Sequence, residues 1–219
     1  MSAVLENPRM DQDTRERILL AAEKVFSEKG QEAASVREIL KNAGVKNIAA
    51  INYYFGDKDR LYIETVKNAH RTCVEGLPFP DPVPGVPATT QLRGFIRTMV
   101  DRMLRPQRAS ALILIMRELS QPSQACAEVV REYIQPIAAR LQGILDQLMP
   151  EAPYARKFMT AFSIVGQCME YRLHRPVMML LMGEENFKKI TAEQIAEHIA
   201  EFTLKGLGGT AETAAEAGK

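Results

Sequence analysis

The sequence lacks the features that mark most enzymes, metal proteins and membrane proteins. It holds no GxSxG, GxGxxG, P-loop or HExxH motif, and its carboxylates are scattered, so we predict no catalytic residue, metal site or cofactor. The longest apolar run, residues 111–116, falls far short of the ~18 residues of a membrane span. The polar, acidic start does not resemble a signal peptide. We therefore expect a cytoplasmic protein that is not an enzyme and has no membrane partner.

Cysteine is scarce, and so is net charge. Cys73, Cys126 and Cys168 lie far apart without CxxC spacing, which suits a reducing compartment and buried thiols more than a disulfide framework. The three histidines also lack metal-ligand spacing. The formal net charge of +1 excludes a histone-like basic chain. It leaves room for a small basic face that binds DNA.

What the sequence does contain is helical periodicity. Apolar residues recur at three- and four-residue steps from Ile18 to Phe202, and no segment alternates as a strand would. Capping-box patterns at residues 35–38 and 191–194 predict two helix starts. The predicted fold is all-α: an N-terminal three-helix helix-turn-helix domain, followed by a larger helical-bundle domain for regulation and dimerisation.

A proline-rich stretch interrupts the helical pattern at residues 77–87. Alternating prolines remove amide donors and fix φ, so this stretch should form a stiff, extended connector. The predicted organisation is a flexible arm (1–12), a DNA-binding domain (13–76), the connector (77–87), a ligand-binding and dimerisation domain (88–205) and a disordered tail (206–219).

The segment from Ser35 to Tyr54 contains the parts of a helix-turn-helix. A short helix would end at Gly44, and a second would open at Asn47. Asparagine can pair with adenine in the major groove, while arginine, lysine and tyrosine suit phosphate oxygens. Between residues 35 and 71, seven basic and four acidic residues leave a net charge of +3. The segment therefore has a composition suited to DNA.

Several spaced motifs strengthen this interpretation: Ile18-Leu-Leu-Ala-Ala-Glu-Lys-Val-Phe, Gly30, Ser35-Val-Arg-Glu-Ile, Ala43-Gly-Val and Ile51-Asn-Tyr-Tyr-Phe-Gly-Asp-Lys58. Together they resemble the DNA-binding domain of the TetR/AcrR family over residues 13–72. The turn before the second helix holds one residue, Lys46, beyond the common family pattern. The resemblance implies operator DNA as a partner and a set of DNA-contacting residues. These are Ser35, Arg37, Lys46, Asn47, Ile48, Ala49, Asn52, Tyr53, Tyr54 and Lys58.

The second half has its own motifs: Arg117-Glu-Leu, Glu132-Tyr-Ile-Gln-Pro136 and Ser163-Ile-Val-Gly-Gln-Cys168. They resemble the C-terminal domain of the CerR/CecR-like branch of the family. This resemblance implies a homodimer built from the last long helices and a regulatory pocket inside the bundle. The predicted pocket residues, for which plain core packing is the alternative, are Phe95, Met99, Met103, Met116, Phe162, Cys168 and Tyr171. The predicted dimer residues are Phe158, Phe162, Val165, Met169, Ile195, Ile199 and Phe202.

The predicted function is a ligand-responsive transcriptional regulator. It would bind a pseudo-palindromic operator as a homodimer, repress transcription and be released by a small-molecule effector. Two alternatives remain open. One is a DNA-bound helical scaffold controlled by a protein partner, and the other is a helical ligand-binding bundle without operator specificity.

Overall fold

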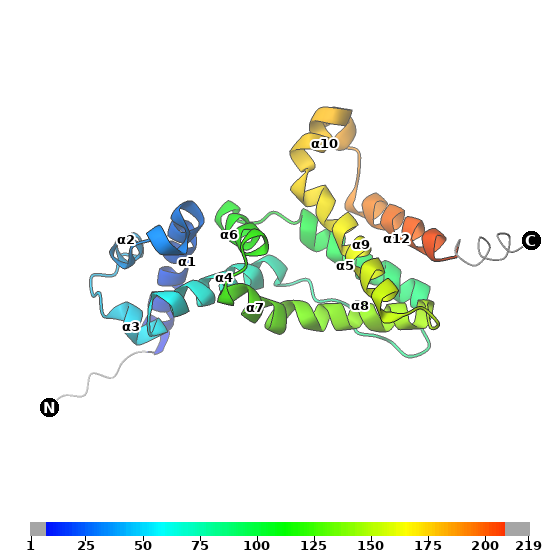
Figure 1. The fold of residues 1–219 in the computed structure, drawn as a ribbon. Coiled ribbons are helices and arrows are strands. Elements are labelled where there is room, and N and C mark those ends of the chain that lie inside the picture. Colours follow the sequence, from blue (N-terminus) through cyan, green and yellow to red (C-terminus); the bar gives the residue numbers. More distant parts are fainter. Residues whose placement is uncertain (1–7, 209–219) are drawn as a thin grey trace, which may run out of the picture. The chain divides into compact units, whose positions relative to one another are not determined.

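The computed structural model describes residues 8–208, and every regular element in that range is a helix (Figure 1). The predicted arm residues 1–7 and tail residues 209–219 lie outside the described residues. The chain forms two compact units, each described by itself below. Unit 1 holds the described residues up to Glu75 together with Gln107–Ile134, and unit 2 holds Gly76–Pro106 together with residues 135–208. The all-α prediction is confirmed.

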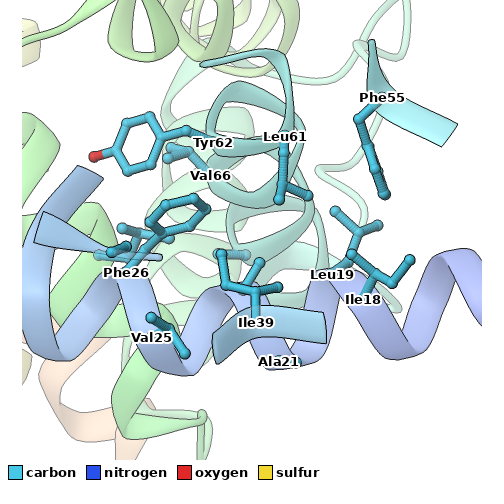
Figure 2. Packing of buried hydrophobic residues seen from close by; sticks show 14 of the residues in the cluster. Ile18, Leu19, Ala21, Val25, Phe26, Ile39, Phe55, Leu61, Tyr62 and Val66 are labelled. Carbon is cyan, nitrogen blue, oxygen red and sulfur yellow. The ribbon is translucent and has the colours of Figure 1, made fainter. Parts of the chain in front are cut away.

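Unit 1 is built around α1 and α4, which pack against each other and against α6. Apolar side chains from α1, α2 and α4 converge in its core, as Figure 2 shows for Phe26, Ile39 and Leu61. Phe26 meets Tyr62 edge-to-face at 5.0 Å between ring centroids. The helical elements of unit 1 are α1 (Pro8–Ala33), α2 (Val36–Asn42), α3 (Ala50–Phe55), α4 (Lys58–Val74), α6 (Ala109–Ser120), α7 (Gln124–Val129) and a π-helix (Val130–Ile134).

Helix α1 begins earlier than predicted. It starts at Pro8, so residues 8–12 are helical and do not belong to a flexible arm. Proline is tolerated in the first turn of a helix, and an acidic residue there, here Asp11, suits the helix dipole. At the other end Gly30 breaks the helix with φ of 80°, a left-handed conformation that favours glycine.

Unit 2 is a bundle in which α5 packs against α8, α9 and α12. Its core is almost entirely apolar and includes Leu92, Ile96 and Leu145. The predicted capping box of the last helix is confirmed: Gln194 N donates to Thr191 Oγ1 (3.1 Å), and Thr191 N donates to Gln194 Oε1 (2.9 Å). The helices of unit 2 are α5 (Ala88–Leu104), α8 (Gln135–Leu148), α9 (Tyr154–Leu173), α10 (Arg175–Met182), α11 (Glu184–Phe187) and α12 (Ala192–Gly208). Because α12 continues to Gly208, the predicted tail began too early.

The proline-rich residues 77–87 contain neither helix nor strand, as predicted, but they are not a free spacer. Phe79 is buried and stacks on Phe95 with 4.6 Å between ring centroids. The guanidinium of Arg102 lies 4.1 Å above the Phe79 ring, and its Nε donates to the carbonyl of Leu77 at 2.7 Å. Arg140 donates to the carbonyl of Phe79 at 2.7 Å. Two arginines and one aromatic ring therefore make this stretch a packed part of unit 2.

Helices α6 and α7 pack in unit 1, although the sequence suggested one domain over residues 88–205. Two buried carboxylates explain this packing. Glu23 of α1 accepts from Arg108 Nε (2.9 Å) and Nη2 (2.7 Å) and from Ser110 Oγ (2.6 Å). Glu118 of α6 accepts from the hydroxyl of Tyr62 in α4 at 2.5 Å. Burial and this bond raise the pKa of Tyr62, so the phenol stays a donor. The α6–α7 segment is thus tied to α1 and α4.

Candidate nucleic-acid interface

The turn that follows α2 depends on Gly44. Its φ is 68°, in the left-handed region. Gly44 N donates to the carbonyl of Lys41 (3.1 Å), and Val45 N donates to the carbonyl of Leu40 (2.9 Å). This pair of bonds is the Schellman pattern that ends a helix at a glycine. It redirects the chain from α2 toward α3 and completes the predicted helix-turn-helix.

The predicted capping box at the start of α2 does not form. Ser35 occupies the N-cap position, but its side chain makes no capping hydrogen bond. Both carboxylate oxygens of Glu38 instead accept from Lys29 Nζ at 2.7 Å. A charge-assisted bond of this kind is stronger than one to a neutral amide, and it competes for the same carboxylate. The pairing with Lys29 therefore takes the Glu38 carboxylate away from the backbone of Ser35.

The second helix begins three residues later than predicted. Helix α3 starts at Ala50, whereas Asn47 lies in the preceding turn. Asn47 Oδ1 accepts from Ala49 N at 2.9 Å, and its carbonyl accepts from Ala50 N at 3.1 Å. Asn47 therefore shapes the turn with its acceptor oxygen. Lys46, the residue beyond the family pattern, also lies in this turn and is exposed.

The short helix α3 is anchored by three buried side chains, those of Ala50, Ile51 and Phe55. Asn52 points away from this anchor and is exposed. Its side-chain amide makes no hydrogen bond to any residue in the described range 8–208. The side-chain amide of Asn52 consequently keeps both an acceptor and a donor available. Adenine presents the matching donor and acceptor in the major groove.

The other predicted DNA-contacting residues lie on the same stretch of unit 1. Lys58, the first residue of α4, is half-buried, and its Nζ donates to the carbonyl of Glu32 at 2.9 Å. Two of the three ammonium donors of Lys58 remain for another acceptor. Tyr54 is half-buried as well. The exposed members of the set are Ser35, Arg37, Lys46, Asn47, Ile48, Ala49, Asn52 and Tyr53.

Three exposed cations add positive charge to this surface. Arg37 and Lys41 lie on α2, Lys46 lies in the turn, and all three are exposed. Within the part of the chain that the structure describes, none of them forms an ion pair. Exposed cations without acidic neighbours are suited to phosphate, because binding releases the counterions of DNA.

Two further cations that contributed to the sequence count of +3 are occupied elsewhere. Arg60 pairs with Glu128 at 3.0 Å, and Lys67 pairs with Glu132 at 2.6 Å. The hydrogen bond from Lys67 lowers the pKa of Glu132 and raises the pKa of Lys67 itself. These cations join α4 to α7 and the π-helix, so their charge is neutralised within unit 1.

Asp11 also belongs to this surface, although it was not predicted from the sequence. Asp11 of α1 accepts from the hydroxyl of Tyr54 at Oδ1 (2.5 Å) and from the hydroxyl of Tyr53 at Oδ2 (3.2 Å). The two tyrosine rings meet edge-to-face at 4.8 Å between centroids. Asp11 lies more than forty positions away along the chain, and no motif or spacing pointed to it.

The chain matches two known families over most of its length. Residues 18–65 match the bacterial regulatory proteins of the tetR family, and residues 88–207 match the C-terminal domain of the HTH-type transcriptional dual regulator CecR. The chain belongs to the TetR family. It is a helix-turn-helix DNA-binding transcriptional regulator with a CecR-type C-terminal domain, as its sequence predicted.

Relatives agree with this assignment. The TetR-family regulator is 26% identical to the HTH-type transcriptional dual regulator CecR of Shigella flexneri, over 93% of this chain and 98% of that protein. Two solved structures share the fold. A TetR-like regulator from Rhodococcus sp. RHA1 has a TM-score of 0.54 at 20% identity and covers 90% of this chain and 96% of its own. FadR of Bacillus subtilis has a TM-score of 0.55 at 18% identity and covers 87% and 98%. None of the helices within residues 8–208 is long and apolar enough to cross a membrane.

In unit 2 of the TetR-family regulator, the structure brings together five of the seven predicted pocket residues. Met116 lies on α6 in unit 1, and Phe162 is 65% exposed on the outside of α9, so neither joins the other five. Burial raises the pKa of Cys168 to about 12 and also raises the pKa of Tyr171. The five that lie in or against the core are Phe95, Met99, Met103, Cys168 and Tyr171.

The predicted dimer residues differ in burial. Ile195 and Ile199 are buried in the core of unit 2. Phe158, Phe162 and Phe202 are between 46% and 65% exposed. Val165 and Met169, on the same helix as the first two, are half-buried. An apolar surface therefore exists on α9 and α12, and it is carried by the phenylalanines.

Proposed function

We propose that this TetR-family regulator reads a pseudo-palindromic operator as a homodimer, represses transcription there, and is released by a small-molecule effector. One observation carries the reading step. Asn52 is exposed on α3 with both edges of its amide unoccupied by described residues, whereas the acceptor of Asn47 is used by the turn. Asn52 is therefore the residue best prepared for a bidentate bond to adenine.

Phosphate contacts would fix the position of α3 on the duplex. Arg37, Lys41 and Lys46 flank the helix-turn-helix without acidic partners among the described residues. Lys58 has ammonium donors left beyond its bond to Glu32. Such contacts carry affinity and salt dependence but no sequence information. A protein seated on an operator in this way blocks the duplex, which is why we propose repression.

The exposed apolar surface of α9 and α12 supports the homodimer. Phe158 and Phe162 lie 4.7 Å apart between ring centroids on α9, and Phe202 of α12 is exposed as well. Beside them a hollow of about 250 Å³ is lined by Met159, Leu207 and others of these two helices. In a two-fold interface each copy would offer both the aromatic side chains and the hollow. The two α3 helices would then stand about 34–36 Å apart, one turn of DNA.

The effector site is proposed among α5, α9 and their neighbours in unit 2. Its candidate lining is Phe95, Met99, Met103, Cys168 and Tyr171, because methionine repacks readily around apolar molecules. FadR of Bacillus subtilis, which shares the fold, is known in complex with stearoyl-CoA. We propose an effector with an apolar chain, which would favour a form of the dimer with a different operator spacing.

Chain connections give the effector a route to the DNA-binding helices. Unit 2 joins the α6–α7 segment at Gln107 and again after Ile134. That segment is held on α1 and α4 through Glu23 and Glu118. A displacement of either junction would therefore reach α4. We accordingly propose residues 13–76 as the DNA-reading domain and residues 88–205 as the regulatory domain.

A second candidate is a DNA-bound scaffold controlled by a protein partner. The observation that favours it is the packing of unit 2, where the five candidate lining residues lie in or against the core cluster. Melting of the protein with a panel of apolar effectors separates the two. An effector that raises the melting temperature and lowers operator affinity supports the first candidate, and a panel without effect supports the scaffold.

The reading role is tested with Asn52→Ala and Lys58→Ala on an operator duplex selected from a random pool. Asn52→Ala should weaken specific binding by about 1–3 kcal/mol and leave random DNA unaffected. Lys58→Ala should weaken all sequences alike and reduce the salt slope by about one. Asn186→Ala, on α11, is the matched control and should change neither. Equal loss of specificity in both variants, or no sequence preference in the parent, contradicts the proposal.

A further inference from the structure

The hydroxyl groups of Tyr53 and Tyr54 are already engaged inside the protein. Both donate to the carboxylate of Asp11, Tyr54 at 2.5 Å and Tyr53 at 3.2 Å. A phenol has a single O–H donor, so a hydroxyl that donates to Asp11 cannot donate to a second acceptor at the same time. Either tyrosine must therefore give up its hydrogen bond to Asp11 before its hydroxyl can donate to a phosphate oxygen.

We propose that Asp11 competes with DNA phosphate for the hydroxyl groups of Tyr53 and Tyr54. While the protein is not bound to DNA, Asp11 accepts a hydrogen bond from each phenol, and it thereby lowers the affinity of the protein for any duplex. This inference rests on the proposed function, because it requires Tyr53 and Tyr54 to lie at the DNA surface. Asp11 would then weaken DNA binding in general and would have no role in sequence recognition.

The position of Asp11 is fixed by the helix that carries it. One turn further along α1, Arg15 pairs with Glu64 at 3.0 Å, and its guanidinium lies 5.2 Å from the centre of the Phe55 ring in α3. Ile18, another turn on, is completely buried. The first turns of α1 are thus attached to α3 and α4 on both sides. Asp11 stays beside the tyrosines without having to move there.

The charge of Asp11 acts in the same direction as its hydrogen bonds. Carboxylate and phosphate are both anionic acceptors of charge-assisted bonds, so the two compete on similar terms for each phenol. A carboxylate at the DNA-facing surface also repels the phosphate that would replace it. Removal of Asp11 should therefore free two donors and remove one repulsion.

A double-mutant cycle separates these two effects. The probe is a mixed-sequence duplex of about three helical turns, since phosphate contacts do not depend on sequence. The effect of Asp11→Ala on duplex affinity is measured in the parent and in the Tyr53→Phe/Tyr54→Phe background. In that background the charge effect remains, but there are no phenol hydroxyls for which Asp11 and phosphate could compete. Glu16→Ala, an exposed acid on the same helix, reports the effect of charge alone.

In the parent background, Asp11→Ala should tighten binding to the duplex roughly threefold to tenfold, the range of one typical net hydrogen bond. Glu16→Ala should tighten it at most about twofold, because an exposed charge is screened by salt. In the phenylalanine background, the effect of Asp11→Ala should fall to that of Glu16→Ala. Asp11→Asn, which keeps the shape of the side chain, should give an intermediate gain and guards against a fraying of α1.

Three results would overturn the inference. Unchanged or weaker binding by both Asp11 variants would make Asp11 a residue that positions the tyrosines for DNA. An equal gain in the parent and phenylalanine backgrounds would reduce it to a charge effect. A gain in Asp11→Ala no larger than in Glu16→Ala would remove the competition altogether. Failure of the parent to bind any duplex at low salt is a different outcome, since it contradicts the proposed function itself.

Discussion

Units 1 and 2 both pack amphipathic helices around a core, but they fix the packing with different groups. In unit 1 two carboxylates are almost fully buried, Glu23 at 1% and Glu118 at 4% exposed, and each accepts several hydrogen bonds. Among the described residues of unit 2, the buried polar residues are Arg102 and Thr203, and no carboxylate is buried. Directional bonds thus define unit 1, and apolar packing defines unit 2.

Their surfaces differ in the opposite sense. Unit 2 exposes large apolar side chains along three of its helices: Phe162 on α9 and Phe202 on α12 are more than 60% exposed, and Leu180 and Leu181 on α10 more than 80%. Contiguous apolar surface of this kind marks an interaction site in a folded protein. On α2, α3 and the turn between them in unit 1, most of the exposed side chains are polar or charged, with Ile48 of the turn as an exception.

The difference indicates that the two units have different roles. A DNA-reading surface has to keep a fixed geometry, and buried polar groups that are fully hydrogen-bonded favour one arrangement over others. A surface that pairs with a second copy or adapts to an effector gains from apolar side chains, which tolerate repacking. The contrast predicts that the two units respond differently to the loss of one side chain.

The largest effect is expected in unit 1. Glu23→Ala leaves Arg108 and Ser110 without their acceptor. We expect a loss of about 3 kcal/mol in the free energy of unfolding, the lower end of the range for a broken buried pair, because Arg108 is 43% exposed and water can hydrate it. Denaturant unfolding followed by circular dichroism measures this. Glu16→Ala, on the exposed side of the same helix, should stay within about 0.5 kcal/mol of the parent. A loss below about 1 kcal/mol for Glu23→Ala would break the contrast between the units.

A smaller effect, and one of another kind, is expected for the exposed face of unit 2. Phe162→Ala should weaken dimerisation by about 2–4 kcal/mol, the range of an aromatic hot spot, because a two-fold interface contains the residue twice. The stability of the folded chain should hardly change, since this side chain is 65% exposed. Analytical ultracentrifugation over a range of concentrations measures the dissociation constant.

Val83→Ala is the matched control for that experiment. Val83 is 55% exposed and lies in unit 2 but outside α9 and α12. It should leave the dimer intact. An unchanged dissociation constant in Phe162→Ala, or an equal change in Val83→Ala, would mean that the exposed face has another partner.

The same contrast shows what a sequence can and cannot specify. Some local features were predicted, such as the turn at Gly44 and the reciprocal cap between Thr191 and Gln194, whereas the capping box at residues 35–38 does not form. Contacts between distant residues were not predicted. Glu23 and Arg108 are 85 positions apart along the chain. Nothing in the sequence indicates that they pair, so the packing of α6 with the DNA-binding helices was not predicted.

Apolar periodicity has a further limit, which α12 illustrates. Ile199 and Phe202 belong to the same predicted stripe, yet one is 1% and the other 63% exposed. Spacing identifies an apolar face but does not say whether helices of the same chain or a second molecule cover it. The same reasoning applies to Phe162, which the sequence placed in both the pocket and the dimer surface and which lies on the outside of α9.

The smallest effect concerns the thiols and tests how closed the core of unit 2 is. Burial raises the pKa of Cys168 from 9.0 to about 12, so its thiol ionises more readily in the unfolded chain than in the folded one. The contribution of Cys168 to stability is therefore fully present below pH 9 and is lost as the pH rises toward 12. At pH 8 a thiol reagent should modify the half-exposed Cys126 of α7 and leave Cys168 intact, because the thiolate is the reactive form. Peptide mass mapping distinguishes the two sites, with the urea-unfolded chain as the control in which both react. Modification of Cys168 at pH 8 without loss of helix signal would show that the core of unit 2 opens while the chain stays folded, as entry of an effector would require.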